Sequence, residues 1–289
     1  MTTTVPNTAL RAVDAVDAVA PDPRPRFRDL YAAEWIRFWS LRSMPWVLGT
    51  GLLVLVAVNL NAARHTYLNT EPGGPPLGSG RVGQALNVSF TMAAVDLLML
   101  LAVGVGAAVV VAEYSSGMIR TTFSAVPDRR AVLLAKAGVL ATAMLGLGTL
   151  AAGASFWAAQ ALLDRRHAGV SITEPGALRV VAAAALLAPV CALAGFGLGV
   201  LIRHAAATVV AGVLVLFLLP ASFNENHAWS AAIVHALPLT AWRRLSWVDL
   251  TNVLLPPHPA TVAGSWLAYA GWAVGSVLLA VTVVRRRDV

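Results

Sequence analysis

Acidic side chains inside or beside long apolar runs are the residues of this sequence best placed to do chemistry. Asp96 lies within the apolar run 87–112, together with Asn87 and Thr91. A carboxylate at membrane depth costs several kcal/mol unless it is neutralised, paired or hydrated. Asp96 is therefore predicted either to serve an intramembrane pathway, by binding a cationic substrate or taking up a proton, or to be a protonated or hydrogen-bonded structural residue near the outer interface.

A second group of charges interrupts two apolar runs, in the stretch EYSSGMIRTTFSAVPDRRAVLLAK at residues 113–136. Its small residues at 115–117 permit a sharp bend, residues 118–123 can form a short amphipathic helix, and Pro127 ends that helix. The segment is too short for a domain. It is predicted to be a helical hairpin parallel to the membrane that offers charged and apolar side chains to a cytoplasmic partner.

Several kinds of chemistry are not supported by the residue spacing. The single lysine, Lys136, follows Leu134 and Ala135, whereas a phosphate-binding loop needs the pattern GxxxxGK[ST]. The six histidines never form a pair one helical turn apart around a glutamate, which zinc proteases require. No serine lies in a nucleophile elbow. We therefore predict no nucleotide, metal or catalytic site on this chain, which is not expected to be an enzyme.

Long apolar segments must position the charged groups. The 289-residue chain is 58% hydrophobic and 12% charged, against about 45–50% and about 25% in soluble domains. A membrane-spanning helix needs about 20 mostly apolar residues. Six segments approach this length, at residues 45–62, 87–112, 131–162, 177–202, 205–223 and 262–284. The predicted fold class is an all-α integral membrane protein with six transmembrane helices.

Arginines set the predicted orientation, because short cytoplasmic loops retain positive charge. With both termini in the cytoplasm, seven arginines lie outside and the other fourteen of the 21 basic residues lie inside. The outside arginines are Arg64, Arg81, Arg165, Arg166, Arg179, Arg243 and Arg244. The net charge of +7 is attributed to arginines at span ends facing anionic lipid, so no nucleic acid partner is predicted.

One amphipathic segment precedes the first span, and another precedes the last span. Residues 1–26 are predicted to be a disordered cytoplasmic tail, and residues 27–289 a single six-span transmembrane domain. Residues 27–46 carry aromatic and apolar side chains at helical spacing, which predicts a helix in the membrane interface with its aromatic face in the headgroup boundary. Glu34 falls within that stripe, which indicates either a protein contact or a carboxylate that reaches water. Residues 224–261 predict short amphipathic helices at the outer interface before the last span, or an ordinary loop.

In this order, these features resemble the membrane-spanning permease subunit of an exporter-type (type-2) bacterial ABC transporter. Members have a glutamate in an amphipathic helix before the first span, here Ala33-Glu34-Trp35. After the second span they have a glutamate, a glycine four residues later, and then proline, arginine and lysine. The matching residues here are Glu113, Gly117, Ile119, Arg120, Pro127, Arg129, Leu134 and Lys136. The ending RRRDV is similar to the Arg-Arg-Asp endings of bacterial members.

The resemblance implies that residues 113–136 form a coupling helix and its return, docked on a separate cytoplasmic P-loop ATPase subunit. ATP and Mg would bind that partner, this chain would bind no cofactor, and two permease copies, identical or related, would surround a pathway in the bacterial cell membrane. The residues it assigns to coupling are Glu34, Glu113, Gly117, Arg120, Arg129 and Arg130. Glu113 and Arg120 are expected to form an ion pair or a partner contact, whereas Arg129 and Arg130 are equally well explained as positive-inside anchors.

Two other function classes stay open. In a self-sufficient secondary transporter, Asp96 would carry a coupling proton and no ATPase would bind. A membrane scaffold or enzyme is the third class, and the sequence offers it no catalytic constellation. The charged segment 113–136 favours the exporter, because a secondary transporter needs no docking surface there. The cargo is expected to be small and hydrophobic or amphipathic.

Overall fold

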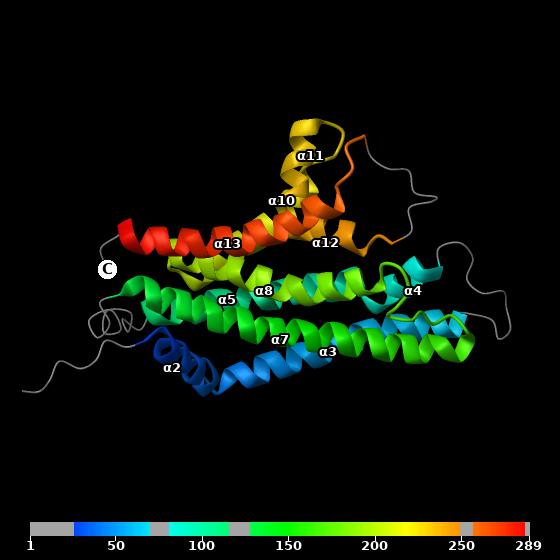
Figure 1. Ribbon diagram of the computed structural model, residues 1–289, viewed down its shortest axis with the longest axis horizontal. Coiled ribbons are helices and arrows are strands. Elements are labelled where there is room, and N and C mark those ends of the chain that lie inside the picture. The colour runs from blue at the N-terminus through cyan, green and yellow to red at the C-terminus, as the bar shows by residue number, and fades with distance from the viewer. Residues whose placement is uncertain (1–25, 70–80, 116–127, 249–256, 287–289) are drawn as a thin grey trace, which may run out of the picture.

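The computed structural model describes residues 26–69, 81–115, 128–248 and 257–286, which form helices and the turns between them. Six helices are long and apolar enough to cross a membrane, and they run roughly along the long axis of the molecule (Figure 1). They cover Ser43–Asn69, Met92–Glu113, Arg129–Arg166, Ala177–Ile202, Ala205–Ser222 and Val262–Arg286. The predicted all-helical class with six spans is confirmed.

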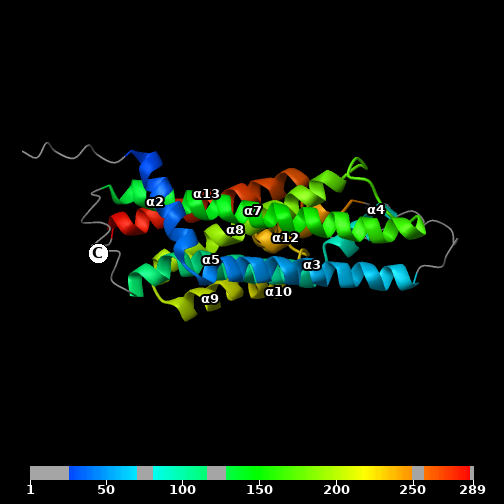
Figure 2. The ribbon, with the colours of Figure 1, turned by 90° about the horizontal axis from the view of Figure 1, so that it is seen from below.

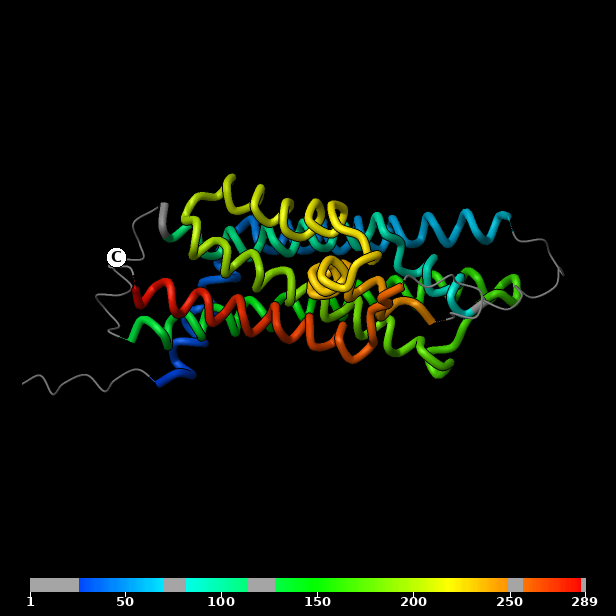
Figure 3. Tube along the Cα trace, turned by 90° about the horizontal axis from the view of Figure 1, so that it is seen from above, coloured from blue at the N-terminus to red at the C-terminus, as the bar shows by residue number. Residues whose placement is uncertain are grey.

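The central helix of the bundle is α8 (Ala177–Ile202), which packs against α5 (Met92–Ser115), α7 (Arg129–Leu163) and α13 (Val262–Arg286). Close approach between α5 and α8 requires glycine on both helices. A Cβ on Gly106 would collide with the carbonyl of Ala192, and a Cβ on Gly195 with the carbonyl of Val103. Small residues of this kind let transmembrane helices pack backbone against backbone. The fifth span lies on the α5 side of α8 and α13 on the α7 side (Figure 3).

The second span begins at Met92 rather than Asn87, because the chain breaks between α4 (Arg81–Ser89) and α5. Asn59 of α3 (Ser43–Asn69) causes the break, since its Oδ1 accepts hydrogen bonds from the Thr91 amide at 3.0 Å and from Thr91 Oγ1 at 2.9 Å. Thr91 Oγ1 in turn accepts from the Ala94 amide at 3.3 Å, which caps the first turn of α5. Ser155 of α7 accepts from the Asn59 amide at 3.0 Å, so one buried asparagine joins three helices.

The fifth span is not a regular helix. It consists of α9 (Ala205–Val213), a π-helical turn (Leu214–Leu218) and α10 (Leu219–Ser222). Pro220 has no amide hydrogen and its ring crowds the carbonyl four residues earlier. The wider π turn accommodates both effects, with the Leu219 amide donating to Leu214 O.

Helix α2 (Phe27–Ser40) lies across the bundle at the end where the C-terminus also lies (Figure 2). The apolar face that was expected to enter the headgroup boundary packs largely on α7 instead. Phe38 is buried, and Tyr31 Oη donates to Thr142 Oγ1 on α7 at 3.0 Å. At the edges of that face, Phe27 and Leu41 remain exposed. A helix pinned in this way can hold charged groups in a fixed position.

Two short helices precede the last span, α11 (Ala228–His235) and α12 (Pro238–Ser246), as predicted. Figure 1 shows α11 projecting sideways from the bundle and α12 lying beside the beginning of α13. Trp242 of α12 is buried, and Arg179 of α8 donates to the carbonyls of Leu245 and Trp247 at the end of the helix, at 3.1 and 2.7 Å. The segment is therefore part of the folded bundle.

Candidate functional site

Four charged side chains from three helices meet at the end of the bundle where α2 lies, and we call them the ion cluster. Glu34 and Arg37 come from α2, Glu113 from the end of α5 and Lys136 from the second turn of α7. Lys136 Nζ lies 2.6 Å from Glu34 Oε2 and 2.5 Å from Glu113 Oε1. Arg37 Nη1 lies 2.9 Å from Glu113 Oε1 and 3.9 Å from Glu34 Oε1. Two cations and two anions thus meet in one cluster whose formal charges sum to zero.

The ion cluster is largely shielded from solvent. Lys136 is 4% exposed, Glu113 6% and Glu34 8%, whereas the side chain of Arg37 is 29% exposed. Taking ions out of water costs several kcal/mol each, and only close pairing with good geometry offsets that cost. Removing one partner leaves the others as uncompensated buried charges. The arrangement therefore makes the position of α2 depend on α5 and α7.

Local sequence explains how each helix brings its charge to this point. Glu34 and Arg37 are three residues apart, which places them on one face of α2. Asp128 caps α7, since its Oδ1 accepts from the amides of Arg130 and Ala131 at 3.1 and 3.2 Å. The cap fixes where α7 begins, and Lys136 follows two turns later on the face toward α2. The interior position of that lysine is thus set by the start of its helix.

The predicted coupling residues fall into three groups. Glu34 and Glu113 lie together in the ion cluster, with most of their surface turned into the bundle. Arg129 and Arg130 begin α7, one half-buried and the other exposed. Gly117 and Arg120 lie outside the described residues, as do most of the predicted hairpin, nearly all of the N-terminal tail and the last three residues of RRRDV.

Asp96, the predicted pathway residue, lies in the second turn of α5, away from the ion cluster. Its side chain is half-buried, and Arg243 of α12 is near enough to interact with it electrostatically. From the sequence, Arg243 was predicted only to be one of the outside arginines. Asp96 therefore faces the α12 segment rather than Glu113 or Lys136.

Sequence reasoning missed the role of two members of the ion cluster. Lys136 was considered as a phosphate ligand and as a match to the family pattern, and Arg37 was given no role. A signal for Lys136 was present, because an ionisable residue within an apolar run needs a partner. Nothing in the sequence indicated that the partner of Lys136 would be Glu34, which is 102 residues away along the chain. Two buried amide side chains were also missed, because their partners too are distant in the sequence or lie in loops. Asn59 holds the break between α4 and α5, and Gln160 holds the loop after α7.

Within the part of the chain that the structure describes, no three or more His, Cys, Asp or Glu side chains form a group that could hold a metal ion. Compared with models of known protein families and with curated proteins, the sequence matches none of them.

Proposed function

We propose that this chain is the permease subunit of an ATP-driven exporter of the ABC type, and that it forms the substrate pathway while a separate subunit hydrolyses ATP. The observation that carries the proposal is the ion cluster. It links a helix lying across the bundle to the ends of the two spans that border residues 116–127. A push on that connecting segment would reach α2, α5 and α7 together.

Six spans and the order of motifs support the same proposal. The spans supply the helices for half of a pathway, and residues 113–136 match the coupling pattern described above. In this proposal, Glu34 and Glu113 are positioning residues, because they are buried against Lys136. Gly117, Arg120, Arg129 and Arg130 would contact the ATPase directly. ATP and Mg would bind the partner, and a second permease copy would complete the pathway in a bacterial cell membrane.

The two roles predict different effects of mutation. In the complex reconstituted in vesicles, Gly117→Val should lower transport-linked ATP hydrolysis at least about fivefold, which corresponds to about 1 kcal/mol, without changing thermal stability. Glu113→Ala should lower both hydrolysis and thermal stability, because it breaks two contacts of the ion cluster. Glu174→Gln, in the loop after α7, is the matched control and should change neither. Unchanged hydrolysis in both Gly117→Val and Glu113→Ala would contradict the coupling role.

A further inference from the structure

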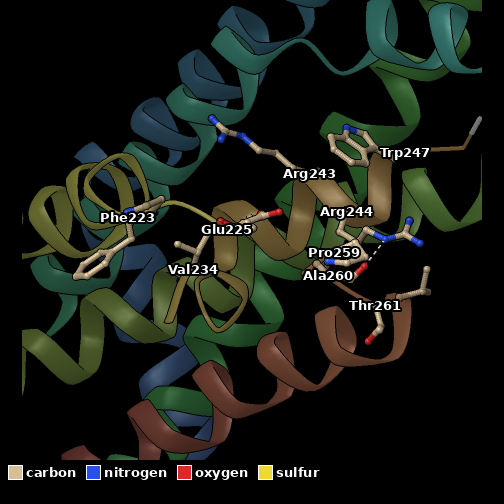
Figure 4. A pocket seen from close by; sticks show the side chains of 12 residues that line it. Phe223, Glu225, Val234, Arg243, Arg244, Trp247, Pro259, Ala260 and Thr261 are labelled. Carbon is tan, nitrogen blue, oxygen red and sulfur yellow. Dashed lines mark hydrogen bonds between the residues drawn. The ribbon is translucent and has the colours of Figure 1, made fainter. Parts of the chain in front are cut away.

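A cavity of about 480 Å³ lies between α12, the loop after α10 and the beginning of α13. Figure 4 shows Phe223, Glu225, Arg244 and Thr261 around it. Its volume falls within the range of about 300–1,000 Å³ that small-molecule sites occupy. Val262 begins α13, and Arg286 ends it at the end of the bundle where α2 also lies, so the cavity is at the opposite end of that span from the ion cluster (Figure 1).

One face of α12 gives the cavity its polar wall. Thr240, Arg243 and Arg244 follow the spacing i, i+3, i+4, which places them on one side of the helix, and Trp247 directly follows the helix end. The other side, with Leu239, Trp242 and Leu245, is buried against the bundle. The cavity wall therefore comes from a helix whose orientation is fixed by its core contacts.

Thr240 supplies an unsatisfied polar atom in that wall. The residue is 7% exposed, and its Oγ1 has no hydrogen-bond partner among the residues that the structure describes. A buried hydroxyl without a partner costs about 1–3 kcal/mol. Arg244, one turn further along, donates from Nε to Ala260 O at 2.6 Å. Its terminal nitrogens form no other hydrogen bond or ion pair among the described residues, so a hydroxyl and a guanidinium remain free on one face.

The charges around the cavity favour an anionic ligand. Arg243 and Arg244 diverge, with Glu225 between them (Figure 4), and Arg243 interacts electrostatically with Asp96. Glu225 is the only acid among the described lining residues, and its Oε1 lies 3.4 Å from His235 Nε2. Arg243 and Arg244 both lie without a carboxylate within ion-pair distance in the described part of the chain, and of the two only Arg243 has an electrostatic influence on Asp96.

We propose that this cavity binds an amphipathic anion, with the acid group held by Arg244 and Thr240 and the apolar body against Phe223, Val234 and Val262. The acid group would neutralise Arg244, which has no carboxylate partner among the described residues, and the apolar walls match a hydrocarbon body. Trp247, 39% exposed at the rim, leaves the site open to surrounding solvent or lipid. The inference rests on the cavity alone and does not depend on an ATPase partner.

Photolabelling of the full chain in phosphatidylcholine nanodiscs tests the proposal. The probe is lauric acid with a diazirine in its chain, and the matched control is the corresponding alcohol. We expect the acid to label peptides containing Phe223 or Val262 at least about fivefold more strongly than the alcohol does. Equal labelling by both probes would overturn the proposal.

Four variants, one of them a control, separate binding from folding. Thr240→Val removes a hydroxyl that has no hydrogen-bond partner in the described part of the chain, so it should lower labelling about threefold without lowering thermal stability. Arg244→Gln should lower labelling about tenfold, and Glu225→Gln should raise it. Arg286→Gln, at the other end of α13, should leave labelling unchanged. Undiminished labelling in both Thr240→Val and Arg244→Gln would overturn the proposal.

The source of the anion is decided by competition. If phosphatidylglycerol added to the nanodiscs displaces the probe, the natural occupant is an anionic lipid headgroup with its chains. If phosphatidylglycerol does not displace it and soluble laurate does, the occupant is a free amphipathic acid. Either result supports the site, whereas displacement by lauryl alcohol as effective as by laurate would contradict it.

Discussion

At the residue scale, Lys136 is the side chain on which the ion cluster depends. Lys136 Nζ lies 2.6 Å from Glu34 and 2.5 Å from Glu113, whereas Arg37 Nη1 lies 2.9 Å from Glu113 but 3.9 Å from Glu34. Breaking a buried pair by removing one partner costs about 3–5 kcal/mol, because the remaining charge stays buried. The ion cluster also joins three helices. Removal of Lys136 is therefore expected to weaken the packing between them as well as to leave a buried charge.

Lys136→Met is therefore expected to destabilise the chain by about 3–5 kcal/mol, seen as a lower Tm in detergent. Glu34→Gln in the same background should restore part of the loss, because it removes the carboxylate that keeps only the longer, 3.9 Å contact with Arg37. A double-mutant cycle between Glu34 and Lys136 measures their coupling. Additive effects would show that the two residues do not act as a pair.

Asn59 provides a second residue-scale prediction with a control two residues away. Asn59→Leu should cost about 1–3 kcal/mol, since the amide and hydroxyl of Thr91 and the hydroxyl of Ser155 lose a partner. Asn61 is exposed, so Asn61→Leu should change stability by less than about 0.5 kcal/mol. Equal Tm values for both variants would contradict the role of Asn59 in fixing the start of α5.

At the element scale, the contact between α5 and α8 depends on glycine at positions where a Cβ would meet backbone atoms. Backbone cannot rotate aside as a side chain can, so the two helices would have to separate. Gly271 and Gly275 of α13 have the same small-xxx-small spacing as Gly195 and Gly199, yet no atom of the described residues lies within 4 Å of a Cβ built on them. The same sequence motif thus has two different structural roles.

Gly195→Val is expected to cost at least about 1–3 kcal/mol by overpacking, and Gly271→Val much less. Comparison of their Tm values and of their elution on size exclusion checks the difference. A larger loss for Gly271→Val than for Gly195→Val would show that the face of α13 is buried against another chain.

Elements were predicted better than the contacts between them. The run 177–202 was predicted with the bounds that α8 has, because length and apolar composition alone define a span. The break before Met92 could not be predicted, since its cause, Asn59, is 32 residues from Thr91. Likewise, Glu34 and Glu113 were singled out, but their shared partner Lys136 depends on how α2 crosses α7. Long-range pairing of this kind follows from packing geometry, which single-sequence patterns do not contain.

At the scale of the whole molecule, two polar regions lie at opposite ends of the spans. The ion cluster holds α2 to the beginning of α7 and the end of α5, and the cavity beside α12 lies where α13 begins. Between them, α8 packs tightly against both α5 and α7. In the proposed exporter, movement at the first region would reach the second through these packed helices.

Isolation of the tagged chain from its native membrane in mild detergent, followed by native mass spectrometry, tests the exporter proposal most directly. The predicted result is a complex with two permease subunits, this one of 30.2 kDa, and a P-loop ATPase, which is lost when residues 113–130 are replaced by a flexible linker. A chain that purifies without an ATPase and transports on a proton gradient would contradict the proposal and make Asp96 the residue to study.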